Sequence, residues 1–494
     1  MNALLVYPRF PDSYWSFRYA LSFQGKLAAQ PPLGLMTVAA LLPASWSKRL
    51  VDTNVEPLKD SDLAWADVVL LSGMHIQHQH LVSIVRRCRI LGLRTVVGGP
   101  IASSLSATEI EADHIVIGEA EEILPDLARD LEAGRARPLY QAVERPSLDR
   151  SPAPELSLIR MHRYSTMTVQ YSRGCPFNCE FCDIIEIYGR RPRSKPIARF
   201  LAELDQLYIL GWRGPVFVVD DNFIGNKVRV RDLLAALAAW QRERRYPFRL
   251  ITEASLNLSD DPSLLEAMAD AGFASVFVGI ETPDYSSLAA ANKHQNTRRD
   301  LLSSIAIIQS YGIEIMGGFI LGFDTDREDI FDRMVDFIQK SAIPIAMVGL
   351  LQAMPGTQLY RRLAREGRIL HAGNGNNTGC ELNFLPRMNP RRLVEGYRSV
   401  LRRIYSREAY DARVRAWLQR CRPHYTTRIN LANLRALILS MVRQGLLGRA
   451  RLSYWKLLFL AATRYRHSFG AAMTMVVMGY HFQVITEQIS GAEV

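Results

Sequence analysis

The chain contains little cysteine and no long hydrophobic run. Only six of its 494 residues are cysteine, and three of these are scattered at positions 88, 380 and 421, which excludes a disulfide framework. The N-terminus lacks a basic segment followed by an apolar core, so we expect a first β-strand there and no signal peptide. The longest apolar run, 469–480, is shorter than the roughly 20 residues that span a bilayer.

The other three cysteines, Cys175, Cys179 and Cys182, lie in one short loop with no fourth cysteine nearby. A structural zinc site usually closes with four ligands, and a fully protein-ligated iron–sulfur cluster needs four cysteines. Three thiolates can hold three irons of a [4Fe–4S] cluster and leave the fourth iron open to a small molecule. We therefore predict a reactive cluster, with a structural zinc ion as the alternative.

Residues 1–142 alternate short apolar strands with helical stretches, a pattern that predicts a doubly wound (Rossmann-like) parallel sheet. The expected strands are 3–7, 49–52, 67–72, 94–98 and 114–118. Ligands of such sheets bind beyond the carboxyl ends of the strands, where glycine lets a bulky ligand approach the backbone closely. The residues at these ends are Ser72, Gly73, Met74, His75, Gly98, Gly99, Pro100 and Glu119.

A proline-rich stretch, 143–160, is expected to be a linker to a second α/β series in 161–370. Its expected strands are 167–171, 216–220, 249–253, 275–280, 314–320 and 346–351. Six strand–helix units predict a partial (β/α)6 barrel of the TIM type, with its chemistry at the carboxyl ends of the strands. The cysteine loop directly follows the first of these strands.

The later strand ends also carry polar residues, each with an alternative structural role. The candidates there are Asp220, Asp221, Asn222, Glu253, Glu281 and Gly322. A zwitterionic sulfonium cofactor needs a carboxylate or carbonyl for its ammonium group, acceptors for its ribose and an apolar slot for adenine. For each acid the alternative is a helix N-cap or a salt bridge at the barrel rim.

The loop Cys175-Pro-Phe-Asn-Cys179-Glu-Phe-Cys182 resembles the CxxxCxxC loop of the radical S-adenosylmethionine (SAM) enzymes. Strands that end in LSGMHIQ, VVGGP and VIGEAE resemble the cobalamin-binding domain that precedes the radical SAM domain in many of these enzymes. The resemblance implies three cofactors, a [4Fe–4S] cluster, SAM and cobalamin. It also implies that the strand ends of the two domains face each other, so that both cofactors reach the substrate.

The resemblance assigns site residues as well. Cys175, Cys179 and Cys182 would hold the cluster, and Asp220–Asn222 the methionine amino group. Glu253 and Glu281 would lie near the methionyl or ribosyl part, and adenine would contact Phe181, Ile320 and Gly322. The loop 7–12 lacks the cobalt-binding histidine of the better-known cobalamin module. His75 is a candidate for that position, and a solvated loop or helix start is the alternative.

Within this family the stretches SGMHIQ, CEFCDI, VDDNFIGN and GIETPD resemble the hopanoid C-2 methylases and their uncharacterised relatives. This implies that a radical removes hydrogen from an unactivated carbon, which then receives a methyl group, with a small molecule or a lipid as acceptor. Cyclisation or rearrangement without methyl transfer is the alternative enzyme activity, and a non-catalytic cobalamin or redox sensor is a further one. The electron donor would be of flavodoxin or ferredoxin type, and the reducing cytoplasm is the expected compartment.

The last region, 371–494, is expected to be basic and mostly helical. Between Arg391 and Gly470 it has 17 arginines and one lysine against three acidic residues, in a chain of net charge +11. Arginine-rich apolar helices can lie on an anionic membrane surface, here the inner face of the membrane. The alternative is a helical cap over the barrel with a solvated arginine face. A nucleic-acid partner is not expected, because nothing resembles an RNA-binding module.

Overall fold

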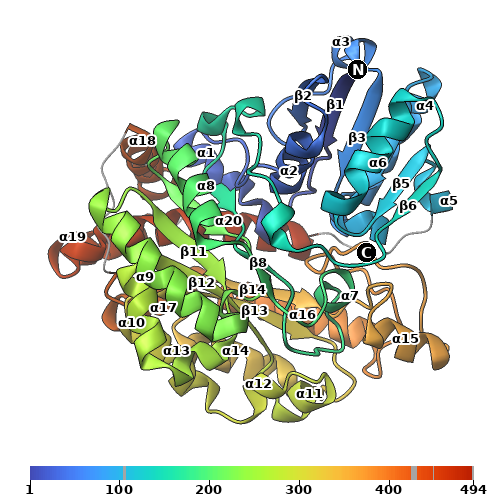
Figure 1. Cartoon of the computed structure of the whole chain (residues 1–494). Helices are drawn as coiled ribbons and strands as arrows, with labels where there is room; N and C mark the ends of the chain where they lie inside the picture. The colour runs from blue at the N-terminus through green and yellow to red at the C-terminus, as the bar shows by residue number, and fades with distance from the viewer. Residues whose placement is uncertain (104–106, 424–430, 449, 492–494) are drawn as a thin grey trace.

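A computed structural model describes residues 1–103, 107–423, 431–448 and 450–491 of the chain. It contains two six-stranded parallel sheets, the N-terminal one at the upper right of Figure 1 and the second below it. Of the C-terminal helices, α18 (Leu431–Ser440) and α19 (Arg451–Thr463) lie at the left of the same view. The predicted fold class is confirmed: a doubly wound α/β domain, a partial (β/α)6 barrel and a mostly helical C-terminal region.

The first sheet has the strand order β2-β1-β3-β4-β5-β6, and every neighbouring pair is parallel. Its strands are β1 (Asn2–Tyr7), β2 (Ser47–Asp52), β3 (Val68–Ser72), β4 (Arg94–Gly98), β5 (His114–Ile117) and β6 (Leu139–Gln141). β6 was not predicted, because three residues are too short to show a period. Residues 3–6 of β1 are fully buried, as expected for a strand covered on both faces.

Helices cover both faces of this sheet, α2 and α6 on one side and α3 and α4 on the other. The helices of the domain are α2 (Leu33–Leu41), α3 (Asp60–Trp65), α4 (His78–Ile90), α5 (Ala107–Ile110) and α6 (Ala120–Glu132). The linker prediction covers residues 143–160, where the structure has only the single-turn helices at 148–150 and 156–158. The domain boundaries themselves stay predictions.

The second sheet has the order β14-β13-β12-β11-β10-β7 and is open, since its edge strands β7 and β14 do not pair. Its strands are β7 (Met167–Val169), β10 (Pro215–Val218), β11 (Arg249–Glu253), β12 (Phe273–Glu281), β13 (Glu314–Leu321) and β14 (Ala346–Leu350). The helices of this region are α7 (Ile184–Ile187), α8 (Ile197–Ile209), α9 (Lys227–Glu243), α10 (Pro262–Asp270), α11 (Tyr285–Ala290), α12 (His294–Thr297), α13 (Leu301–Ser310), α14 (Ile330–Ser341) and α15 (Gln358–Arg365). A small antiparallel pair, β8 (Ser172–Arg173) and β9 (Arg193–Ser194), flanks the cysteine loop.

The C-terminal helices pack on the β13–β14 side of the barrel, where α16 contacts α14 and α17 contacts α13 and α14. They are α16 (Pro390–Ile404), α17 (Arg407–Arg420), α18 (Leu431–Ser440), the π-helical turn η9 (Met441–Leu446), α19 (Arg451–Thr463) and α20 (Phe469–Gly491). Residues 466–491 are long and apolar enough to cross a membrane by length and composition, contrary to the expectation from the shorter apolar run. However, 56% of the apolar window is buried inside the protein, as in a core helix.

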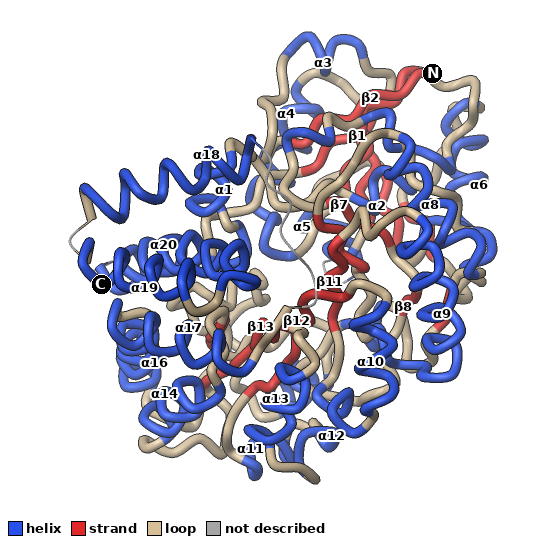
Figure 2. The backbone as a smooth tube through the Cα atoms, turned by 90° about the vertical axis from the view of Figure 1, so that its left-hand side faces the viewer, coloured by secondary structure: helices blue, strands red, loops and turns tan. Residues whose placement is uncertain are grey.

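A short N-terminal segment leaves the first sheet and joins these helices. It comprises η1 (Tyr14–Ser16) and α1 (Arg18–Gln24), and α1 contacts α18 and α20. The hydroxyl groups of Tyr14 and Thr486 form a hydrogen bond of 2.9 Å, and the Phe23 and Tyr480 ring centres are 5.4 Å apart. Figure 2 shows α1, α18 and α20 together at the left of the molecule. The two ends of the chain therefore stabilise one another.

Buried ion pairs connect the two sheets. Glu119, after β5, accepts from Nη1 of Arg173 at 2.6 Å and from Nη2 of Arg193 at 2.6 Å. Glu121, in the first turn of α6, lies 2.7 Å from the second nitrogen of Arg173. Burial opposes ionisation of Glu121, but Arg173 outweighs burial and lowers the pKa of Glu121 below its ordinary 4.5.

We expect Arg173→Ala to lower the free energy of unfolding by about 3–5 kcal/mol, because it leaves the buried Glu121 without its ion-pair partner and Glu119 with Arg193 alone. The matched control is Arg150→Ala, which breaks the exposed pair with Glu122 on the same helix and should cost at most about 1 kcal/mol. Because the pKa of Glu121 is lowered, its stabilising contribution is present above pH 4.5 and is lost on acidification. Equal losses for the two variants in urea unfolding would contradict this assignment.

Candidate active site between the two sheets

Two adjacent acids hold the strand end from which the cysteine loop starts. Asp220, only 1% exposed, accepts hydrogen bonds from two successive backbone N–H groups, both at 2.8 Å, and from the Ser172 hydroxyl at 2.6 Å. Asp221 accepts one from the backbone N–H of Gly174 at 2.7 Å. A Cβ at Gly174, whose φ is 97°, would lie 2.9 Å from the carbonyl oxygen of Gly189. Both acids thus hold the loop by hydrogen bonds to its backbone, which is neither the N-cap nor the salt bridge considered for them, and their contact with SAM stays a prediction.

The three thiols lie close enough to affect one another's ionisation. Burial raises the pKa of Cys182 well above its ordinary value, and the neighbouring Asp183 and the thiols of Cys179 and Cys175 raise it further. The amide of Asn222 donates to Sγ of Cys175 at 3.9 Å. Clustered thiolates therefore repel one another in this loop, and binding of positively charged iron would relieve that repulsion.

A single metal ion does not fit this arrangement. Among the residues that the structure describes, no group of three or more Cys, His, Asp or Glu is compact enough to hold one ion. A mononuclear site needs all of its ligands around one centre, whereas in a [4Fe–4S] cluster each cysteine ligates a different iron. The donor set fits a cluster with one open iron.

Two glutamates at the strand ends differ in their partners. Glu281 forms an ion pair of 2.6 Å with Nζ of Lys293, which lies 6.0 Å from the ring centre of Phe181. Glu253 has no hydrogen bond or ion pair among the described residues. Burial, with repulsion from Asp221 and Asp220, raises the pKa of Glu253 to about 8. A partly buried acid without a partner at this edge fits a cationic ligand such as SAM.

The three residues predicted to contact adenine lie together. Phe181 and Ile320 pack against a small apolar cluster that includes Phe323 and Leu351, and the Phe181 and Phe323 rings meet edge-on at 6.1 Å. Gly322, at the end of β13, has a φ of 107°. Phe181 and Ile320 thus belong to one apolar cluster, which Gly322 adjoins in sequence, and the adenine contacts stay a prediction.

The glycine-rich ends of β3 and β4 form one edge of the first sheet. The two strands are neighbours, with Ser72 in register with Gly98. A Cβ at Gly99, whose φ is 84°, would lie 2.3 Å from Oγ of Ser72. The backbone of Gly99 therefore packs directly against the side chain of Ser72. Gly73 and Pro100 lie in these loops, and Met74 is 44% exposed. Glu119 is occupied by the two arginines described above, and its contact with cobalamin stays a prediction.

His75 connects this edge to the cysteine loop. Its Nε2 lies 3.9 Å from Oδ2 of Asp183, the residue after Cys182. His75 is 6% exposed, and a Cβ at Gly375 would come within 2.9 Å of its Cβ. Burial lowers the pKa of His75, although Asp183 opposes the shift. The strand ends of the two domains therefore face each other, as predicted.

The sequence did not reveal an aromatic pair inside the barrel. Trp15 packs edge-on against Phe277 of β12, with ring centres 5.1 Å apart. Phe277 is in register with Glu253 of β11, so their side chains project from the same face of the sheet. Gln295, whose amide donates to Sγ of Cys179 at 3.6 Å, was missed as well. No spacing rule connects these residues, because they come from separate elements.

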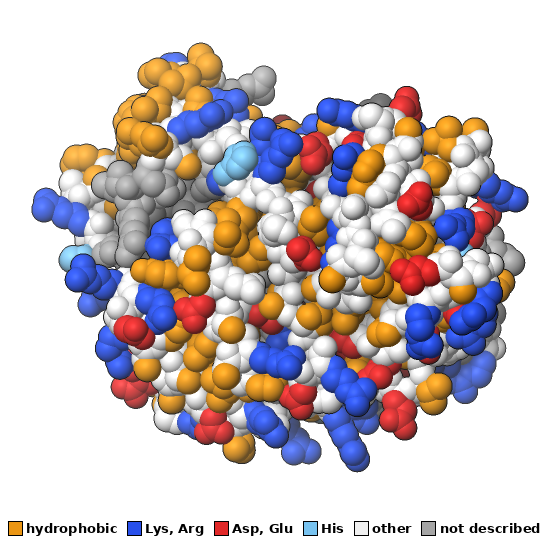
Figure 3. Space-filling view, turned by 45° about the horizontal axis from the view of Figure 1, so that its top comes forward, with side chains coloured by type: hydrophobic (Ala, Val, Ile, Leu, Met, Phe, Trp, Pro, Cys, Tyr) orange, Lys and Arg blue, Asp and Glu red, His pale blue; other side chains and the backbone are white. Residues whose placement is uncertain are grey.

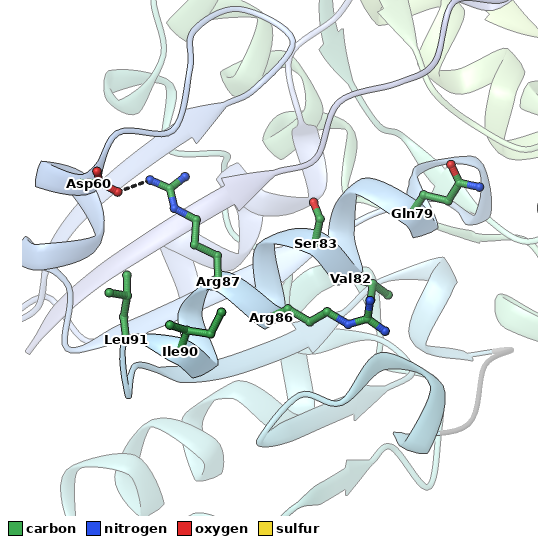
Figure 4. Close-up of a pocket in the computed structure, with 8 residues that line it drawn as sticks. All are labelled: Asp60, Gln79, Val82, Ser83, Arg86, Arg87, Ile90 and Leu91. Carbon is green, nitrogen blue, oxygen red and sulfur yellow. Dashed lines mark hydrogen bonds and ion pairs between the residues drawn. The ribbon is translucent and has the colours of Figure 1, made fainter.

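A hollow on the outer face of α4 lies away from this site. Figure 4 shows its lining, in which Arg87 donates to Asp60 at 2.5 Å. It is lined by Asp60, Gln79, Val82, Ser83, Arg86, Arg87, Ile90 and Leu91. None of the predicted site residues borders it, and we assign it no role.

A three-cysteine loop on an open parallel barrel, facing the edge of a doubly wound sheet, defines the class of cobalamin-binding radical SAM enzymes. Family models agree: residues 28–128 match the B12 binding domain and residues 169–338 the radical SAM superfamily. Residues 357–493 match a domain of unknown function (DUF4070).

Full-length relatives extend the match. An uncharacterized methyltransferase of Synechocystis sp. is 42% identical, with 92% of this chain and 86% of the relative covered. The hopanoid C-2 methylase of Rhodopseudomonas palustris is 35% identical, with 99% and 94% covered. The chain belongs to the cobalamin-dependent radical SAM methyltransferases, and its cofactors are a [4Fe–4S] cluster, SAM and cobalamin, as predicted.

Two solved structures share the fold. The cobalamin-dependent enzyme OxsB, with aqua-cobalamin and SAM bound, matches with a TM-score of 0.63 and 14% identity over 99% of this chain and 79% of that chain. The methyltransferase TsrM from Kitasatospora setae, with cobalamin and a [4Fe–4S] cluster bound, matches with a TM-score of 0.57 and 16% identity over 76% of each chain.

Replacing Cys175, Cys179 or Cys182 with serine should remove most of the roughly four irons expected per chain, because each thiolate ligates one iron. Iron and sulfide content after anaerobic reconstitution checks this. Cys380→Ser is the matched control, since Cys380 is a free cysteine outside the loop. Retention of a full cluster by any of the three loop variants would contradict the ligand assignment.

Glu253→Gln should weaken SAM binding about tenfold at pH 9 and have little effect at pH 6.5. The reason is that a Glu253 pKa of about 8 leaves the acid neutral at the lower pH and ionised at the higher one, where it attracts the cationic cofactor. The ratio of wild-type to variant affinity isolates Glu253, because titration of SAM itself is common to both. The control variant Glu243→Gln, at an exposed position, should bind SAM as tightly as the wild type at both pH values. An affinity ratio for Glu253→Gln that does not change with pH would contradict the assignment.

Proposed function

We propose that this enzyme methylates an unactivated carbon of a lipid, such as a hopanoid. The observation that carries the proposal is the similarity to hopanoid C-2 methylase along 99% of the chain. That similarity includes the C-terminal helices, which lie beyond both cofactor domains. A shared cofactor chemistry alone would require similarity only over the two sheets.

When bound, the cluster, SAM and cobalamin supply radical formation and a methyl group. The protein then has to hold them facing one another and exclude water. In this proposal the three loop cysteines hold the cluster, and Glu253 pairs with the charge of SAM. The edge formed by Ser72–His75 and Gly98–Pro100 holds cobalamin, and Arg173 and Arg193 keep that edge over the cysteine loop through their ion pairs with Glu119.

The interior of the barrel suits an apolar acceptor. Trp15 and Phe277 present two aromatic rings on the same face as Glu253. Rings of this size contribute large, rigid contact areas, which a fused-ring lipid can match. Trp15 is still 40% exposed, so part of its surface is available to an acceptor. A lipid acceptor also implies peripheral contact with a membrane through the C-terminal region.

The proposal includes an acidic electron donor of flavodoxin or ferredoxin type. Arg190 and Arg191 follow the cysteine loop and are exposed, and Arg190 donates to the carbonyl oxygen of Pro176 at 3.4 Å. Neither arginine forms an ion pair with a described residue. An acidic protein would be attracted to this face at low salt. Cluster reduction that is equally fast at low and high salt would contradict this part of the proposal.

Lipid mass spectrometry on cells fed methyl-deuterated methionine tests the function. We expect the wild-type strain to contain a lipid with an intact labelled methyl group that the deletion strain lacks. A deletion strain that expresses the Trp15→Ala variant should make less than about a tenth of the wild-type amount of that lipid. The reason is that the acceptor loses an aromatic contact worth about 1.4 kcal/mol or more. Tyr246→Ala, a comparably exposed ring, should restore it fully.

Other outcomes separate the alternatives. A lipid that changes without carrying the labelled methyl group would support cyclisation or rearrangement. Loss of a labelled soluble metabolite with no change in lipids would refute the lipid acceptor while leaving the methyltransferase class intact.

A further inference from the structure

Large apolar side chains are exposed along one side of the last part of the chain. Across α18, η9 with its C-cap residue, and α19, their exposed fractions range from 39% to 86%. They are Leu431, Leu434, Ile438, Val442, Leu446, Leu447, Leu452, Trp455 and Phe459. Scattered single apolar residues are normal on a protein surface, but a contiguous group indicates a binding surface. We call this group the α18–α19 surface.

The spacing of these residues shows that they form a face of each helix. Leu431, Leu434 and Ile438 follow intervals of three and four, as do Leu452, Trp455 and Phe459, so each set lies on one side of its helix. The opposite side of α18 packs on α1 and α20. Among the residues that the structure describes, the exposed face has no packing partner. Figure 3 shows hydrophobic side chains gathered with Lys and Arg on a protruding corner at the upper left.

Charge around this surface has one sign. No aspartate or glutamate occurs between Asp411 and Glu487, so the helices carry only cations. Arg451, Lys456 and Arg464 are exposed, and within the described ranges none of them forms an ion pair. On α4, by contrast, the exposed Arg86 and Arg89 both pair with Glu111.

We propose that the α18–α19 surface docks onto an anionic lipid bilayer, with both helices lying in the plane of the interface. Exposed leucine, tryptophan and phenylalanine suit the acyl boundary, and the unpaired cations suit anionic headgroups. Both helices are far shorter than the roughly 20 residues that span a bilayer, so they dock and do not cross. A nucleic acid would leave the apolar side chains without a partner.

The docking surface is connected to the acceptor side of the active site. Arg443, in η9, donates to the Ser22 hydroxyl of α1 at 3.1 Å and lies 5.1 Å from the Phe23 ring centre. α1 begins three residues after Trp15, whose ring packs on Phe277 in the barrel. A bilayer at this corner would therefore bring its lipids to the segment that carries Trp15. This step rests on the proposed lipid acceptor, whereas docking itself does not.

Cosedimentation of the reconstituted holoenzyme with vesicles tests docking. Wild-type protein should bind phosphatidylcholine vesicles that contain phosphatidylglycerol, and binding should weaken with salt and without the anionic lipid. The triple variant Leu452→Ser, Trp455→Ser, Phe459→Ser should bind about tenfold more weakly or worse. The double variant Arg451→Glu, Lys456→Glu should lose the dependence on anionic lipid.

Matched controls are available on other helices. Ile90→Ser with Ile209→Ser removes equally exposed apolar residues from α4 and α8, and Arg86→Glu with Arg89→Glu reverses charge on α4. Both controls should bind vesicles like the wild type. Cluster absorbance confirms that every variant is folded. Wild-type binding by the triple variant, or no binding by the wild type, would overturn the proposal. So would a dimer, seen by light scattering, that the triple variant breaks without any vesicle binding.

Activity separates docking from the proposed function. The triple variant should lower the ratio of methylation of a vesicle-borne acceptor to methylation of the same acceptor in detergent. If the wild type binds vesicles but methylates no lipid in either form, the lipid acceptor is wrong and docking stands. If it methylates lipid in detergent but binds no vesicle, docking is wrong and the proposed function stands.

Discussion

Two buried glutamates pair with two partly buried arginines where the two sheets meet, and the rest of the site depends on this pairing. Glu119 and Glu121 lie between β5 and the first turn of α6 in the N-terminal domain, and Arg173 and Arg193 flank the cysteine loop. A buried charge that loses its partner costs several kcal/mol, so neither domain can move away without leaving such charges behind. This mutual requirement holds the glycine-rich edge over the cysteine loop and accounts for the contact between His75 and Asp183.

The acids of the barrel rim differ in their partners. Three of them bind groups of the protein, and one has no protein partner and could bind a ligand. Asp220 and Asp221 accept hydrogen bonds from the backbone at the start of the loop, and Glu281 pairs with Lys293. Glu253 alone among these acids has no partner in the described structure, and burial, together with its two acidic neighbours, raises its pKa. A carboxylate held in this state favours a positively charged ligand, and SAM is the cofactor of this family that carries such a charge.

The N-terminal segment and the C-terminal helices pack together and form a part of the enzyme that neither cofactor domain provides. The segment after β1 carries Trp15 into the barrel and then packs, as α1, on α18 and α20. The domain matched by residues 357–493 therefore supports a residue of the barrel interior as well as the exposed apolar face. This arrangement relates the two proposals made above, because one short helix lies between the aromatic pair and the docking surface.

The sequence by itself determined the elements and the cofactors, because both depend on neighbouring residues. Strand and helix periodicity is a local property, and so is the spacing of the three cysteines. Tertiary structure alone decided which polar groups remain free. Glu119 was predicted to contact cobalamin, but its partner in the structure is Arg173, 54 residues away. The contact between Trp15 and Phe277 could not be predicted from the sequence either. A side chain's partner is set by elements that meet only after folding, so the sequence indicated the candidate residues and the fold determined which of them a ligand can reach.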